Sequence, residues 1–252
     1  MIAVGVSGAA GRMGRLVSET VLAAEDLRLA ALYAPGRRSI EIGGLSSSDA
    51  PGVMESVTVV VEVTNPDVVM ENLRRWRGFG VHAVVGTSGF TAERLFELEG
   101  LWGKGPPNCL VVPNFSISAI LMMRFAELAA PHLEGAEIIE LHHEDKPDAP
   151  SGTSLATARR IAAAKPGMAH GRGRELVSGA LGAEVEGVPI HSVRLPGLVA
   201  HQEVIFGAEG QTLSIRSDAT SWSCFIPGVL LAVRRVGEVA GVTVGLESLL
   251  GL

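Results

Sequence analysis

The sequence predicts an α/β protein in which a doubly wound parallel sheet is followed by a second, α+β domain with an open mixed sheet. Apolar residues make up 47% of the chain and aromatic residues only 4%, which is typical of parallel strands covered by helices on both faces. Short apolar runs alternate with runs of helical period up to about Asn114, and strand patterns predominate after Gly187. At 252 residues the chain is long enough for two such domains.

The expected elements of the first domain begin with the strand Ile2–Val6, a glycine turn and a helix that ends near Ala24. Further strands and helices then alternate. The expected strands are Leu27–Leu32, Val57–Val63, Val81–Val85 and Cys109–Val112, and the expected helices are Asp67–Trp76 and Thr91–Leu98. This alternation predicts parallel strands joined by helices.

The second domain is expected to begin with a helix, a strand and another helix, at Ser118–Ala130, Ala136–Leu141 and Ser154–Ala163. A Gly-rich stretch, Lys165–Gly187, separates them from three strands. These strands, His191–Leu195, Val199–Phe206 and Thr212–Arg216, have the spacing of an antiparallel meander, with Gly207 and Gly210 bracketing a turn. The apolar helix Ile226–Val236 is expected to return to the first sheet.

Charge and cysteine usage exclude several classes of protein. A formal charge of −6 and a pI near 5.7 argue against nucleic-acid binding. Arg74, Arg75 and Arg77 lie near a predicted helix C-terminus, where a solvated face is the simplest interpretation, and we assign them no function. Cys109 and Cys224 are isolated and predicted to be reduced, which indicates a cytoplasmic protein. Met1 runs directly into the strand Ile2–Val6 with no charged segment, and no long apolar run follows, so neither a signal peptide nor a membrane span is expected.

A glycine turn follows the first strand directly. Gly8, Gly11 and Gly14 are spaced by three, between a strand and a helix, where backbone N–H groups and the helix dipole would meet a pyrophosphate. A tight turn alone would explain one or two of these glycines. Polar residues at Asn65-Pro66 and Gly86–Gly89 follow two further strands, at the ends where ligands bind in open sheets.

The stretch Glu140–Thr153 combines two histidines, a lysine and a Ser-Gly-Thr turn. Imidazole transfers protons near neutral pH, an ammonium group donates a proton or holds a carboxylate, and the N–H groups at a helix start attract anions. The stretch therefore suits a small acidic substrate that is reduced and protonated. The alternatives are a solvated loop before a capped helix and a zinc site, but the adjacent histidines lack metal-ligand spacing, so no metal is expected.

Four motifs together carry a family resemblance. They are Gly8–Gly14, Gly86–Phe90, Pro113–Ile117 and, with the highest specificity, His142-His143-x-x-Lys146-x-Asp148-Ala149-Pro150-Ser151-Gly152-Thr153. Over nearly its whole length the chain resembles the bacterial 4-hydroxy-tetrahydrodipicolinate reductase (dihydrodipicolinate reductase) family, most closely its actinobacterial members.

The resemblance implies a Rossmann-type dinucleotide-binding domain at residues 1–113 and 223–252, and a substrate-binding and tetramerisation domain at 114–222. It implies NADPH or NADH as cofactor, a small dicarboxylate substrate, a homotetramer, and a reduction in lysine and diaminopimelate biosynthesis. It also assigns roles to individual residues. The residues assigned are His142 and Lys146 for acid–base catalysis; His143, Ser151, Gly152 and Thr153 for the substrate; and Gly8, Ala9, Ala10, Gly11, Arg12, Met13, Arg37, Arg38, Gly86, Thr87, Ser88, Val112, Pro113, Asn114 and Phe115 for the cofactor.

Four positions depart from the family pattern, at Val63, Ser88, Ser118 and Trp222, where Phe, Thr, Gly and Arg are expected. The departures at Val63 and Trp222 leave open a non-catalytic nucleotide-sensing protein. Another two-domain imine or amino-acid dehydrogenase on the same nucleotide fold is the second alternative, although it gives no reason for the motif that contains His142 and Lys146.

The residues after the second strand bear on cofactor choice. No acid follows Leu32 where NAD-selective sites place one, and Arg37 and Arg38 come next, so we expect NADPH to serve at least as well as NADH. Two solvated arginines on a flexible loop are the alternative.

Overall fold

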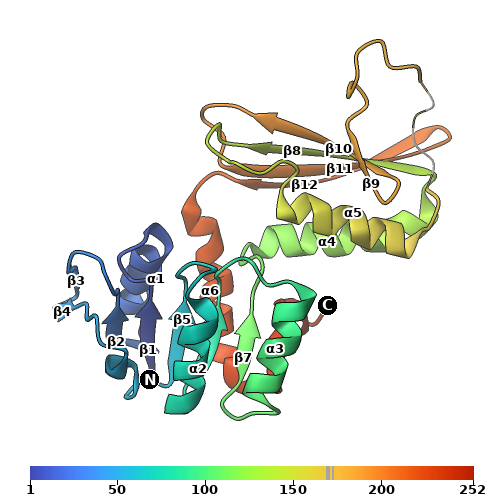
Figure 1. The fold of residues 1–252 in the computed structure, drawn as a ribbon. Helices are drawn as coiled ribbons and strands as arrows, with labels where there is room; N and C mark the ends of the chain where they lie inside the picture. Colours follow the sequence, from blue (N-terminus) through green and yellow to red (C-terminus); the bar gives the residue numbers. More distant parts are fainter. Residues whose placement is uncertain (169–170, 172) are drawn as a thin grey trace. The chain divides into compact units, whose positions relative to one another are not determined.

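The computed structural model describes residues 1–168, 171 and 173–252, and the chain folds as two compact units (Figure 1). Unit 1 comprises Met1–Phe115 and Phe225–Leu252, and unit 2 comprises Ser116–Cys224. Both crossing points lie two residues C-terminal to the boundaries expected from the family resemblance.

Unit 1 contains a six-stranded sheet in the order β13-β7-β6-β5-β1-β2, and every strand pair is parallel. The strands are β1 (Ile2–Ser7), β2 (Leu27–Tyr33), β5 (Val59–Glu62), β6 (His82–Val85), β7 (Cys109–Val111) and β13 (Val242–Val244). Successive residues of the central strands are buried, as expected when both faces are covered. The predicted doubly wound sheet is confirmed.

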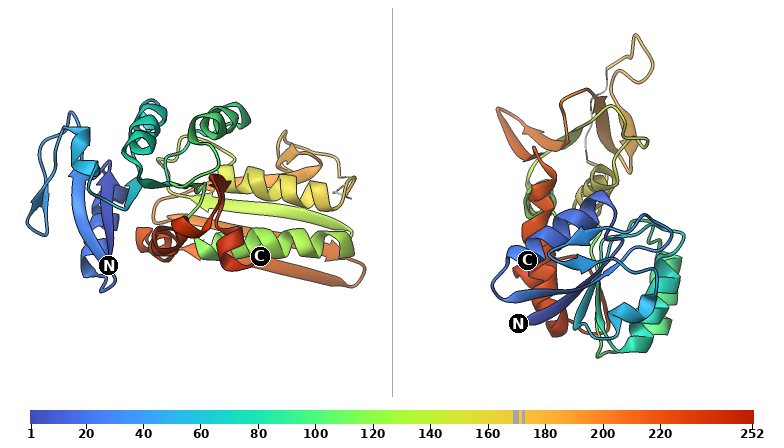
Figure 2. Two further views of the ribbon diagram at one scale, coloured as in Figure 1. Left: turned by 90° about the horizontal axis from the view of Figure 1, so that it is seen from below. Right: turned by 90° about the vertical axis from the view of Figure 1, so that its left-hand side faces the viewer.

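Helices lie on both faces of this sheet (Figure 2). They are α1 (Arg12–Ala23), α2 (Val69–Phe79), α3 (Ala92–Trp102), α6 (Ile226–Arg235) and the short α7 (Glu247–Leu250). Helix α2 continues past the expected end at Trp76 because its C-cap is Gly80, whose φ of 74° favours glycine. The predicted return of the chain to the first sheet is confirmed, since α6 belongs to unit 1.

Short elements complete unit 1 and its connections. A two-stranded hairpin, β3 (Glu41–Ile42) and β4 (Leu45–Ser46), follows β2, and neither it nor β13 was expected from the sequence. Single 3-10 turns lie at Pro51–Met54, Ala130–His132, Trp222–Phe225 and Val236–Glu238.

Unit 2 contains a five-stranded mixed sheet in the order β12-β11-β8-β10-β9. The strands are β8 (Gly135–His142), β9 (Ala183–Val185), β10 (Val188–Arg194), β11 (Ala200–Ala208) and β12 (Gln211–Ala219). The helices are α4 (Ile117–Ala129) and α5 (Gly152–Ala164), which lie side by side against the sheet (Figure 1).

The predicted antiparallel meander is wrong for its first strand. β10 pairs in parallel with β8, from Ile190 opposite Ile138 to Arg194 opposite His142, and β11 pairs with the other edge of β8. The reason is the crossover helix α5 between β8 and β10, because strands joined by a helix run parallel. β11 and β12 do form a hairpin, but Gly207 pairs within it, opposite Thr212, and only Glu209 and Gly210 form the turn.

The expected Gly-rich stretch Lys165–Gly187 contains β9 and also residues 169, 170 and 172, which lie outside the described residues. Both cysteines are free thiols, and burial raises the pKa of each. Among the described residues no helix is long and apolar enough to cross a membrane.

Candidate active site

The three glycines of the first turn have separate structural reasons. Gly8 has a φ of 87°, and a Cβ there would lie 2.5 Å from the carbonyl oxygen of Val63. Gly11 is the N-cap of α1, and a Cβ on Gly14 would lie 2.2 Å from the carbonyl oxygen of Gly8. The N–H groups of Gly8 and Ala9 donate to the carbonyl of residue 33, at 2.9 and 3.2 Å. The turn is therefore held tightly against the ends of β2 and β5.

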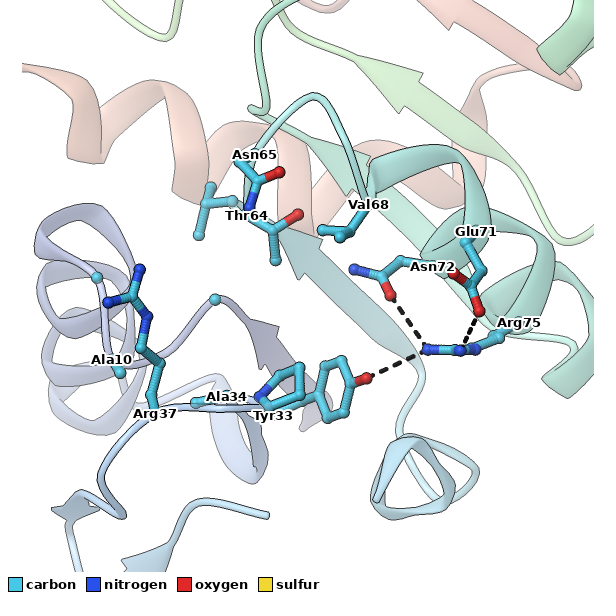
Figure 3. A pocket seen from close by; sticks show the side chains of 14 residues that line it. Ala10, Tyr33, Ala34, Arg37, Thr64, Asn65, Val68, Glu71, Asn72 and Arg75 are labelled. Atoms are coloured by element: carbon cyan, nitrogen blue, oxygen red, sulfur yellow. Dashed lines mark hydrogen bonds and ion pairs between the residues drawn. The ribbon is translucent and has the colours of Figure 1, made fainter. Parts of the chain in front are cut away.

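A cavity of about 530 Å³ opens beside this turn (Figure 3). Its wall includes Gly8, Ala10 and Gly11 of the turn, and Arg37 from the loop after β2. Of the two arginines assigned to the cofactor, Arg37 lines the cavity, whereas Arg38 is exposed and does not.

The far side of the cavity is formed by α2 and the last residue of β2. Arg75 donates to the hydroxyl of Tyr33 at 3.2 Å and to the amide oxygen of Asn72 at 3.5 Å, and it forms an ion pair with Glu71 (Figure 3). All four residues line the cavity. The sequence analysis placed Arg75 on a solvated face; its side chain is partly exposed, but it lines this cavity. Helical periodicity shows a polar face but not which strand end lies opposite it.

The neighbouring arginines of α2, Arg74 and Arg77, make other contacts. Arg74 pairs with the exposed Glu97, as a solvated side chain would, and Arg77 donates from Nε to the carbonyl of Trp102 at 2.9 Å.

A buried carboxylate lies at the end of β5. Glu62 is 0% exposed and accepts hydrogen bonds from the Thr64 hydroxyl, from Trp76 Nε1 at 2.8 Å and from Asn72 Nδ2 at 3.4 Å. Burial raises its pKa, although these hydrogen bonds act in the opposite direction. Its backbone carbonyl accepts from the N–H of Gly86 and the hydroxyl of Thr87. Glu62 thus connects cavity-lining residues with the loop after β6.

The loops after β6 and β7 also meet within unit 1. A Cβ on Gly86 would lie 2.5 Å from the ring of Phe115 and 3.1 Å from Val63. Val112 is buried and donates to the carbonyl of Val85 at 2.8 Å. Of the residues assigned to the cofactor, Gly86, Thr87, Val112 and Phe115 therefore line the same edge of the sheet, while the Ser88 position is exposed.

In unit 2, His142 is bound by a carboxylate that the sequence analysis did not single out. Glu140 and His142 are two residues apart on β8, so both side chains point to the same face of the strand. Glu140 is 0% exposed; it bonds Nδ1 of His142 and accepts from Arg194 of β10 at 2.9 Å. Burial alone would raise the pKa of Glu140, but the hydrogen bonds from His142, Arg194 and Ser192 outweigh it and lower the pKa to about 2.

The loop after β8 carries Lys146. Its ammonium group donates to Asp148 at 2.6 Å, which lowers the pKa of Asp148. Arg194 donates to the carbonyl of Asp148 at 2.7 Å and so joins this loop to Glu140. His143 lies at the start of the loop and is half-buried. The period-two alternation of β8 could have identified Glu140 from the sequence. Arg194 could not be identified in this way, because its position beside Glu140 depends on the parallel pairing of β10 with β8.

Helix α5 begins at the end of this loop. Ser151 is its N-cap and accepts from the N–H of Ser154 at 3.2 Å. Ser151 is 3% exposed, so its hydroxyl is used within the protein. Gly152 and Thr153 form the first turn, where the helix dipole favours anions. The described residues contain no group of three or more His, Cys, Asp or Glu side chains that could hold a metal ion.

The departures from the family pattern differ in their surroundings. Ser118 lies in the first turn of α4 and its hydroxyl bonds Ser217 of β12 at 2.9 Å. Val63 lies against Gly8 and Gly86, as described above. Trp222 is 38% exposed.

Unit 1 has a glycine turn and a cavity at the carboxyl ends of parallel strands, and unit 2 has a histidine–carboxylate pair and a lysine. These features are typical of a two-domain, dinucleotide-dependent oxidoreductase. Comparison with known proteins agrees. The family "Dihydrodipicolinate reductase, N-terminus" matches residues 2–115, and "Dihydrodipicolinate reductase, C-terminus" matches residues 118–250.

Individual relatives cover the chain almost completely. The 4-hydroxy-tetrahydrodipicolinate reductase of Mycolicibacterium smegmatis is 49% identical over 99% of both chains, and that of Nocardia farcinica is 49% identical over 100% of this chain and 99% of its own. A dipicolinate-bound dihydrodipicolinate reductase from Paenisporosarcina sp. TG-14 has a TM-score of 0.83 at 37% identity, covering 98% of this chain and 99% of its own. The chain belongs to the dihydrodipicolinate reductase family, and is an NAD(P)H-dependent oxidoreductase of lysine biosynthesis.

An amine dehydrogenase from Mycobacterium smegmatis is only 14% identical, with a TM-score of 0.61 over 96% of this chain and 94% of its own. It shares the fold alone.

Proposed function

We propose that this chain uses His142 and Lys146 to handle the protons in the reduction of 4-hydroxy-tetrahydrodipicolinate, via dihydrodipicolinate, to tetrahydrodipicolinate. The observation that carries this proposal is the hydrogen-bonded set Glu140–His142, joined through Arg194 to the loop of Lys146. A buried carboxylate bound to Nδ1 orients the ring, so that Nε2 remains for the substrate.

The fit of unit 1 to the cofactor rests on its cavity and on the N-terminus of α1, which begins at the glycine turn that lines this cavity. Because the N–H groups of Gly8 and Ala9 bond the carbonyl of residue 33, we assign the pyrophosphate to Ala10 and the first turn of α1. Arg37 would meet a 2′-phosphate, which supports a preference for NADPH. When bound, NAD(P)H supplies the hydride that adds to C4 of the dihydropyridine.

Three proton transfers remain for the protein. Water loss from the 4-hydroxy compound takes a proton from the ring carbon next to C4 and gives one to the leaving hydroxyl group, and hydride addition leaves a carbanion-like centre that takes up one proton. His142 and Lys146 are assigned to these transfers. His143 and the first turn of α5, Gly152 and Thr153, are assigned to the substrate carboxylates, because helix N-termini attract anions. Ser151 contributes by capping that helix.

A coupled assay tests the assignment. The substrate is generated by its synthase, and oxidation of NADPH is followed by absorbance for the wild type, His142→Ala and Lys146→Ala. An acid–base group contributes ~10²–10⁴ in rate, so kcat should fall by that order in both variants, whereas His143→Ala should mainly raise KM. His191→Ala is a matched control. His191 pairs with Glu137 on the same sheet at 2.6 Å, but it lies outside the segment that carries His142, His143 and Lys146.

Near-normal kcat for Lys146→Ala would contradict the assignment. If the wild type binds NADPH but shows no turnover, the chain is instead a nucleotide-sensing member of its family.

The same family membership supports a cytoplasmic homotetramer. Helices α4 and α5 cover one face of the unit 2 sheet, and the half-buried Ile139, Leu141 and Ile205 project from the other. These apolar side chains alternate with ion-paired ones, such as Glu137 with His191 and Glu203 with Arg216, and a mixed face of this kind suits an interface with a second copy. Light scattering of the purified protein should give four times the mass of 26.3 kDa.

A further inference from the structure

The cavity of unit 1 has two chemically different ends. Ala10 and Arg37 lie at one end, and Glu71, Asn72 and Arg75 lie at the other, with Tyr33 between them (Figure 3). In the part of the chain that the structure describes, Arg37 pairs with no carboxylate, whereas Arg75 is neutralised by Glu71. An unpaired guanidinium suits a phosphate, and a neutralised one suits an uncharged group.

Arg75 is held in place before any ligand binds. Its guanidinium donates to Tyr33 at 3.2 Å and to Asn72 at 3.5 Å. Tyr33 is 3% exposed and packs edge-on against Trp76, with ring centroids 5.6 Å apart, and Asn72 is 3% exposed and donates to Glu62. An arginine fixed in this way loses little entropy when a ligand binds.

We propose that Arg75 binds the adenine of the cofactor, with its guanidinium against the face of the base. A pyrophosphate at the glycine turn directs the adenosine half of a dinucleotide toward the end of β2 and the neighbouring α2. There the planar guanidinium stacks on an aromatic ring, and the Glu71 carboxylate accepts from the exocyclic amine. The inference rests on the cavity being the cofactor site, as proposed above.

Binding is measured directly by the fluorescence of NADH and NADPH, and with AMP as a competitor, so that no turnover is required. Arg75→Met should raise Kd for NADH and NADPH by the same factor, about three- to tenfold, because both cofactors carry adenine. The apparent Kd of AMP should rise by that factor too. Arg75→Lys keeps the charge and the reach to Glu71 but lacks the planar group, so it should resemble Arg75→Met.

Arg74→Met is the matched control. Arg74 is the preceding residue of α2, is similarly charged and paired, and does not line the cavity, so its variant should bind all three nucleotides as the wild type does. Unfolding midpoints of all variants show whether the fold is retained.

The variants of Arg37 and Arg75 together distinguish a wrong role for Arg75 from a wrong placement of the cofactor. If Arg37→Ala weakens NADPH binding while Arg75→Met changes nothing, or changes NADPH binding alone, then Arg75 does not contact adenine. If both variants bind both cofactors normally, the cavity is not the cofactor site and the placement itself fails.

Discussion

The indole N–H of Trp76 donates to the carboxylate of Glu62 across 2.8 Å, and both side chains are 0% exposed. No arginine or lysine is among the groups described as acting on this carboxylate, which are the side chains of Thr64, Trp76, Ser7 and Asn72. A buried carboxylate with only neutral donors resists ionisation, so the pKa of Glu62 is raised above its ordinary value of 4.5.

This relationship predicts a pH-dependent stability. Because the folded state holds the Glu62 proton more tightly than the unfolded state, the contribution of Glu62 to stability is present below pH 4.5 and is lost as pH rises through the folded pKa. Glu62→Gln keeps an acceptor for Trp76 and removes the titration. Its unfolding midpoint should therefore rise relative to the wild type as pH increases from 4 to 8.

The control for this comparison is Glu62→Leu, which leaves the donors of Trp76 and Asn72 without an acceptor and should cost about 1–3 kcal/mol at any pH. A constant difference between Glu62→Gln and wild type across the pH range would contradict the prediction.

Glu140 should act in the opposite sense. Its folded pKa, about 2, lies below the ordinary 4.5, so its stabilising contribution is present above pH 4.5 and is lost as pH falls toward 2. Glu140→Gln should lower the unfolding midpoint at pH 7 and have a smaller effect at pH 3. It should also lower kcat by at least about tenfold, since His142 loses its anionic partner. Asp218→Asn, which removes a half-exposed partner of His201, should change kcat little.

The glycine turn predicts a sharp contrast between two Gly→Ala substitutions. In Gly14→Ala the new Cβ meets the carbonyl of Gly8 at 2.2 Å, so we expect a loss of about 1–3 kcal/mol in stability and weaker NADPH binding. Gly100 lies on α3 with open space around it, and Gly100→Ala should raise stability by about 0.5–1 kcal/mol. Chemical unfolding and nucleotide titration measure both effects; equal behaviour of the two variants would show that the turn is not tightly packed.

The two arginines after β2 are predicted to differ. Arg37 lines the cavity and Arg38 does not, so Arg37→Ala should lower kcat/KM for NADPH by about ten- to a hundredfold, the effect of one charge-assisted hydrogen bond, and leave NADH unchanged. Arg38→Ala should change neither. Steady-state kinetics with both cofactors measure this, and a preference for NADH that survives both substitutions would mark the arginines as bystanders.

The sheet of unit 1 could be predicted from sequence because its strands are apolar runs bounded by helices of clear period. The two-residue strands β3 and β4 and the three-residue β13 were missed because such short segments show no periodicity. The prediction that β10 pairs with β11 was wrong. Proximity in sequence favours that pairing, but α5 directs β10 to the edge of β8 opposite to the one that pairs with β11.

The parts of the candidate site that could be predicted, such as Gly8 and His142, are those in which the residue types and their spacing within one short segment indicate the chemistry. Arg194 was missed because a buried ion pair between strands depends on register, which the sequence does not display, whereas the alternation along β8 could have identified Glu140. The position of Arg75 beside the cavity was missed because one of its partners, Tyr33, lies 42 residues away in the sequence.

Tyr33 serves the cavity through two chemically independent groups. Its carbonyl holds the N–H groups of Gly8 and Ala9, and its hydroxyl holds Arg75. Every residue supplies a carbonyl, so the hydrogen bonds that hold the glycine turn do not depend on which side chain stands at this position. The bond to Arg75 requires a hydroxyl group at the far end of an aromatic ring, which only tyrosine carries. A substitution to phenylalanine, which one base change produces, would remove the bond to Arg75 and leave the turn in place, so that the two ends of the cavity can change independently during evolution.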